Sequence, residues 1–84
     1  MSMTLTAELS LYPLREDYVA VILEFIEGLK PHAEITVKTN AMSTQLVGPH
    51  DKVMSAVSET LKLSAERFGM QVLVCKFIAA ELEI

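Results

Sequence analysis

The chain of 84 residues is long enough for one small domain and too short for two. It carries 7 Lys and Arg against 11 Asp and Glu, so its formal net charge is −4, and the basic residues are scattered. Binding to nucleic acid or to an anionic membrane surface needs clustered cations. The charge pattern therefore argues against both kinds of partner.

Apolar residues make up 51% of the chain, yet no apolar run approaches the roughly 20 residues that span a bilayer. The first residues lack the basic and apolar segments of a secretory signal. Cys75 is the only cysteine, which excludes an internal disulfide and a cysteine-based zinc site. We expect a cytoplasmic domain without membrane insertion. Because so small a domain cannot bury all its apolar surface, we also expect a homo-oligomer.

The first half of the chain predicts a strand followed by a helix. Residues 4–12 alternate between apolar and polar side chains, and Pro13 ends this strand. Residues 16–29 have helical spacing, with acidic residues near the start and Gly28 and Pro31 at the end. The residues expected on the buried stripe of this helix are Val19, Ile22, Leu23, Ile26 and Leu29.

The second half predicts a hairpin, a helix and a final strand. Residues 33–39 alternate, Asn40-Ala41 form a short connection, and residues 42–47 form the partner strand. Asn40 suits this connection because Asn tolerates the left-handed conformation of tight hairpins. Gly48-Pro49 then breaks the chain. Residues 50–68 predict a second helix, and residues 70–78 are strongly β-prone.

The order strand, helix, strand, strand, helix, strand is the βαββαβ pattern of the ferredoxin-like fold. We predict an α+β sandwich over residues 1–84 as one domain. Its four-stranded antiparallel sheet has two helices on one face. Right-handed crossovers place the strands in the order last, first, third, second.

The sheet face away from the helices is called the open face here. In the first three strands it is expected to carry Thr6, Glu8, Ser10, Tyr12, Thr36, Lys38, Ser43 and Gln45. If Lys76 points away from the helices, the last strand adds Val72, Val74 and Ile78. The open face would then combine small polar groups with an apolar edge, a surface suited to a second subunit with a polar pocket between.

The residue inventory gives little support for catalysis. His32 and His50 lie in connections, and no His, Cys or carboxylate cluster has metal-ligand spacing. Three glycines are too few for a glycine-rich phosphate loop. Cys75 lies in an apolar strand and is interpreted as a packed thiol. We therefore predict no catalytic residue, no metal and no cofactor.

Residues 39–45 instead gather five hydrogen-bonding side chains in seven positions. Hydroxyls and amides both donate and accept, so the segment suits a neutral heteroaromatic ring. The alternative is an ordinary polar hairpin, since Asn, Ser and Thr are common turn residues.

Three segments resemble the YkoF-like family that binds thiamine or hydroxymethylpyrimidine. They are ELSLYPL at residues 8–14, EDY at residues 16–18 and TNAMSTQLVG at residues 39–48. The resemblance implies binding of thiamine or its pyrimidine moiety for salvage or transport, without catalysis. The motif suggests Ser43 and Thr44 as contacts to the pyrimidine, with Asn40 in the same segment. Ser10, Tyr12 and Gln45 complete the predicted ligand-binding set because they are expected on the open face.

Within this set, Ser43 and Thr44 point to opposite faces if the strand is regular. Both can contact one ligand only at a strand end or beside a bulge. If the strand is regular from Met42, Ser43 and Gln45 stay in the predicted site and Thr44 is excluded from it. Glu8 or Tyr12 could face the cationic thiazolium of whole thiamine.

The chain matches a single unit of a family that also has tandem members, so another subunit must complete the pocket. A homodimer or homotetramer is therefore expected. The alternatives are an oligomeric structural or regulatory module that binds another small ligand, and an enzyme with an unrecognised site.

Overall fold

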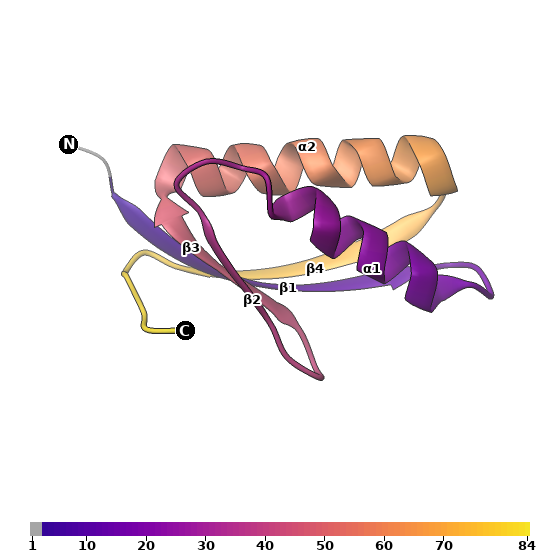
Figure 1. Ribbon diagram of the computed structural model, residues 1–84, viewed down its shortest axis with the longest axis horizontal. Helices are drawn as coiled ribbons and strands as arrows, with labels where there is room; N and C mark the ends of the chain where they lie inside the picture. The colour runs from indigo at the N-terminus through magenta and orange to yellow at the C-terminus, as the bar shows by residue number, and fades with distance from the viewer. Residues whose placement is uncertain (1–2) are drawn as a thin grey trace.

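The computed structural model describes residues 3–84 and has the predicted α+β ferredoxin-like architecture. Figure 1 shows both helices on one side of the sheet and the C-terminal segment on the other. The elements are β1 (Thr4–Pro13), α1 (Tyr18–Leu29), β2 (Thr36–Thr39), β3 (Thr44–Pro49), α2 (His50–Phe68) and β4 (Gln71–Ile78).

The sheet order is β2-β3-β1-β4, and every neighbouring pair is antiparallel. This confirms the predicted strand order. β1 and β3 are the inner strands, while β2 and β4 form the two edges. No helix among residues 3–84 is long and apolar enough to cross a membrane.

The core lies between the sheet and the helices. Alternate residues of β1 point into it because successive side chains of a strand face opposite ways. The buried apolar residues are Leu5, Ala7, Leu9 and Leu11 of β1, Leu46 of β3, Val21, Phe25, Ile26 and Leu29 of α1, and Val53, Ala56 and Val57 of α2. The helices therefore cover one face of β1, and no helix of the described residues packs on the other (Figure 1).

The predicted stripe of α1 is partly wrong. Ile26 and Leu29 are buried as expected, but Val19 and Leu23 are more than half exposed. Val21 and Phe25 take their place in the core. Because α1 is apolar on most of its circumference, spacing alone did not identify the face that packs on the sheet.

The hairpin strands also differ from the predicted ranges. β2 begins only at Thr36, since the backbone at Glu34 has a φ of 68° and cannot continue a strand. β3 runs on through Gly48 and Pro49, which pair with β1 rather than break the chain. A side chain at Gly48 would place its Cβ 2.7 Å from the Glu34 carbonyl oxygen. Glycine is required there by the close approach of the two backbones.

We expect the Leu46→Ala substitution to lower the free energy of unfolding by about 2–5 kcal/mol, because a fully buried leucine leaves a cavity. Urea denaturation measures this change. The matched control is Leu63→Ala, whose side chain is 67% exposed and whose removal should change stability little. Equal losses for the two variants would contradict the assigned core.

Candidate functional site

The register of the strands confirms the composition of the open face. Directly opposite residues of an antiparallel pair lie on the same face. Across β1 and β4 the open-face pairs are Thr6–Ile78, Glu8–Lys76, Ser10–Val74 and Tyr12–Val72. Across β1 and β3, Glu8 lies opposite Gln45. Polar groups thus lie toward the middle of the sheet, and apolar side chains line the β4 edge.

Glu8 is the charged centre of the open face. The Ser43 hydroxyl donates a hydrogen bond of 2.9 Å to one carboxylate oxygen of Glu8. The Lys76 ammonium lies 3.7 Å from the other oxygen, and the Glu8 side chain is still 40% exposed. A carboxylate and a hydroxyl are therefore held together where a ligand can reach both.

The β2–β3 hairpin positions Ser43 through the side chain of Asn40. The Asn40 amide oxygen accepts hydrogen bonds from the backbone N–H groups of Met42 and Ser43, at 2.8 and 2.9 Å. The Asn40 backbone N–H donates to the Ser43 carbonyl oxygen at 2.9 Å. Asn40 stabilises this turn by hydrogen bonding, an Asx-type arrangement, and not by a positive φ.

The six predicted site residues do not all lie together. Ser10, Tyr12, Ser43 and Gln45 belong to the open face, with Tyr12 55% exposed. Asn40 lies at the turn beside them. Thr44 is buried on the helix side, opposite Leu9 and 3.3 Å from the Thr39 hydroxyl. Because β3 is regular from Thr44, this residue has no access to a ligand on the open face.

Residues 79–84 cover part of the open face (Figure 1). The sequence did not predict this contact. The Thr6 hydroxyl donates to the Ala80 carbonyl oxygen at 2.7 Å and accepts from the Leu82 N–H at 3.0 Å. Lys38 donates to the Ile84 carbonyl oxygen at 3.3 Å. The segment has neither helical nor strand periodicity, so no sequence signal pointed to this position.

A shallow hollow of about 240 Å³ lies where residues 79–84 meet the open face. Its side-chain walls combine charged and polar groups with apolar ones: Thr6, Glu8, Gln45, Lys76, Ile78 and Leu82. Glu8 therefore contributes to both this hollow and the contact with Ser43, and the two form one continuous candidate site.

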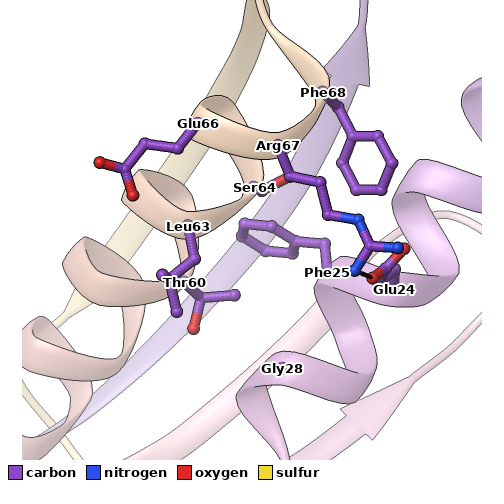
Figure 2. A pocket seen from close by; sticks show the side chains of 9 residues that line it. All are labelled: Glu24, Phe25, Gly28, Thr60, Leu63, Ser64, Glu66, Arg67 and Phe68. Atoms are coloured by element: carbon purple, nitrogen blue, oxygen red, sulfur yellow. Dashed lines mark ion pairs between the residues drawn. The ribbon is translucent and has the colours of Figure 1, made fainter.

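A larger cavity of about 510 Å³ lies between α1 and α2, away from the open face (Figure 2). Its walls include the Phe25 and Phe68 rings, and Arg67 reaches across to form an ion pair with Glu24. Its lining includes no histidine or cysteine, and Arg67 already pairs with Glu24. The buried Thr60 hydroxyl also lines it and has no hydrogen-bond partner in the described part of the chain.

The next features are the groups in residues 3–84 that could bind a metal ion or act as a thiol nucleophile. No group of three His, Cys, Asp or Glu in this range could hold a metal ion. Burial raises the pKa of the Cys75 thiol, which keeps it protonated at neutral pH. A thiol of this kind is a weaker nucleophile than a free cysteine.

The family model described as the YKOF-related family matches residues 4–80. The chain belongs to the YKOF-related family. The match covers all six strands and helices and includes every predicted site residue. It confirms the family indicated by the TNAMSTQLVG segment. No match was found among curated proteins.

Solved structures of low sequence identity share the fold of this YKOF-related chain. Protein SP2199 from Streptococcus pneumoniae has a TM-score of 0.84 at 24% identity, covering 95% of this chain and 90% of its own. A domain of unknown function from Bacillus cereus has a TM-score of 0.82 at 20% identity, covering 100% and 86%. A Thermotoga maritima protein with a proposed role in thiamine biosynthesis or salvage has a TM-score of 0.83 at 20% identity, covering 96% and 90%.

We expect Asn40→Ala to lower the free energy of unfolding by about 1 kcal/mol, since two backbone N–H groups lose their acceptor. Asn40→Asp is the matched control because its carboxylate still accepts both bonds. Thermal unfolding of the two variants measures the difference. Equal stability of the Ala and Asp variants would show that the side chain does not hold the turn.

Proposed function

We propose that this YKOF-related protein binds thiamine or its hydroxymethylpyrimidine moiety, without catalysis, for thiamine salvage or transport in the cytoplasm. The observation that carries the proposal is the contact between Ser43 and Glu8 on the open face, 2.9 Å between oxygen atoms. A carboxylate accepts hydrogen bonds from an exocyclic amine, and the Ser43 hydroxyl, whose single proton is donated to Glu8 here, donates to a ring nitrogen once a ligand turns it away from Glu8. An aminopyrimidine presents both groups on one edge.

β1 places a carboxylate and an aromatic ring on the same face of the sheet. Glu8, Ser10 and Tyr12 alternate onto the same face, so Tyr12 lies roughly 13 Å from Glu8 at the usual strand rise. The exposed Tyr12 ring offers a stacking surface. A carboxylate at one end and an aromatic ring at the other can each stabilise a cationic thiazolium. Ser10 and Gln45 supply polar contacts between and beside them.

The proposed pocket requires a second subunit. The hollow on the open face is shallow, and the face exposes Tyr12, Val72, Val74 and Ile78, each between 45% and 55%. A single chain therefore leaves one side of a bound ligand in water. We propose a homodimer or homotetramer in which another copy closes the site.

The second candidate function is an oligomeric structural or regulatory module that binds a different small ligand. The observation that favours it is the same apolar β4 edge, which a subunit contact would cover without any thiamine. A stable oligomer that gives no heat with thiamine or hydroxymethylpyrimidine would support this alternative.

Calorimetric titration with thiamine and with hydroxymethylpyrimidine tests the proposal. The chain has no Trp, so intrinsic fluorescence is a poor probe. Saturable binding near one ligand per subunit or per dimer is the expected result. An absence of heat with both ligands at several temperatures would reject the thiamine proposal.

We expect Ser43→Ala to weaken thiamine binding about fivefold or more, because a buried hydrogen bond contributes about 1 kcal/mol. Ser58→Ala, an exposed serine of α2, is the matched control and should bind as the original protein does. Calorimetry gives both dissociation constants. Equal affinity of the two variants would remove Ser43 from the site.

We expect Glu8→Gln to weaken binding of thiamine more than binding of hydroxymethylpyrimidine. The amide oxygen of Gln still accepts a hydrogen bond from Ser43, but the negative charge that attracts a thiazolium is lost. The ratio of the two dissociation constants, measured by calorimetry, isolates this charge. An unchanged ratio would contradict a thiazolium contact with Glu8.

A further inference from the structure

The cavity between α1 and α2 has the size and the walls of a small-molecule site. Its volume of about 510 Å³ lies within the range of pockets that hold small ligands. Phe25, Leu63 and Phe68 supply apolar walls, and Figure 2 shows both aromatic rings directed into the space between the helices. Such rings stack on a planar ligand or meet its edge. The cavity is therefore suited to a small aromatic molecule.

The charged groups that face the cavity cancel one another. Arg67 of α2 forms an ion pair with Glu24 of α1 (Figure 2), and its guanidinium lies 5.2 Å from the centre of the Phe68 ring. Glu66 also lies at the rim, but Figure 2 shows its carboxylate directed away from the space between the helices. An anion or a cation would have to break this ion pair to gain a partner of its own. The cavity therefore favours an uncharged ligand.

One polar group in the wall of the cavity is unpaired. The Thr60 side chain is 5% exposed, and its hydroxyl oxygen has no hydrogen-bond partner in the part of the chain that the structure describes. Ser64, one turn further along α2, is also buried, but its hydroxyl donates to the Gln71 side chain at 2.9 Å. A buried hydroxyl without a partner lowers stability. A ligand that bonds to Thr60 would remove this penalty.

Gly28 of α1 lies beside Thr60 and leaves room for its side chain. A Cβ at residue 28 would lie 3.2 Å from the Thr60 methyl carbon, which is closer than ordinary van der Waals contact. The Thr60 methyl group therefore occupies the space that a side chain at residue 28 would need. Threonine has two accessible χ1 rotamers in a helix, so its hydroxyl can turn toward a ligand in the cavity.

We propose that the α1–α2 cavity binds an uncharged aromatic molecule of the phenol class, whose hydroxyl pairs with the hydroxyl of Thr60. The Phe25 and Phe68 rings hold the aromatic part of this ligand. The cavity lies on the helix side of the sheet and is separate from the thiamine site proposed for the open face. Thiamine itself fits the cavity poorly, because the one acidic group facing it is already paired with Arg67. The inference goes beyond the proposed function and does not rest on it.

A ¹⁵N–¹H NMR titration of the intact protein with 2-naphthol, an uncharged aromatic alcohol, tests the site. We expect the backbone signals of Phe25, Thr60 and Leu63 to shift and saturate, while those of Glu8 and Ser43 stay in place. 2-Naphthoate has the same rings with a carboxylate, and should bind about fivefold more weakly or worse because its charge lacks a free partner. The absence of saturable shifts around the cavity, or equal binding of 2-naphthoate, would overturn the inference.

Thr60→Val tests the hydrogen bond, because valine has the shape of threonine without the hydroxyl. We expect 2-naphthol to bind about fivefold more weakly. The urea midpoint should not fall, since the hydroxyl that is removed is unpaired in the free protein. Thr36→Val, at an exposed threonine of β2, is the matched control and should bind as the original protein does. Equal affinity of the two variants would overturn the inference.

Gly28→Ala tests the location of the ligand by a second route. Alanine is favoured over glycine in a helix, so the variant should fold, but its Cβ crowds the Thr60 methyl group and narrows the cavity. We expect weaker binding of 2-naphthol, and unchanged affinity would overturn the placement beside Thr60. Cavity signals that follow protein concentration instead of 2-naphthol would identify a subunit contact and would also overturn it. Thiamine binding is read from the open-face signals, so the two proposals fail separately.

Discussion

The alternation of side chains along β1 is the constraint on which the rest of the molecule depends. Leu5, Ala7, Leu9 and Leu11 form the floor of the core beneath both helices. The residues between them are therefore directed to the open face. Since a one-residue slip would exchange the two sets, burial of the core fixes which polar groups are exposed together. The candidate site is thus a direct consequence of the packing on the other side of β1.

The candidate site depends on contacts between residues far apart in the sequence. Ser43 reaches Glu8 across the sheet because Asn40 closes the β2–β3 turn and β3 pairs with β1. Glu8 in turn holds Lys76 of β4. Polar contacts therefore connect the hairpin, the central strand and the edge strand in one layer.

Much of the fold followed from periodicity, and the parts that did not have local physical causes. The predicted range of α2 and the strand order are confirmed, because both come from strong amphipathic patterns. The stripe on α1 was partly wrong because that helix is apolar on most sides. At the hairpin, Asn40 acts through side-chain hydrogen bonds, which spacing does not reveal. Residues 79–84 reach Thr6 by a tertiary contact with no periodic signal.

The most direct test of the account is a ¹⁵N–¹H NMR titration of the protein with thiamine. If the open face binds the ligand, the backbone signals of Ser10, Tyr12, Ser43 and Gln45 should shift together and saturate. Signals around the α1–α2 cavity, such as that of Leu63, should stay in place. Shifts confined to that cavity, or none at saturating thiamine, would contradict the assignment of the open face as the thiamine site.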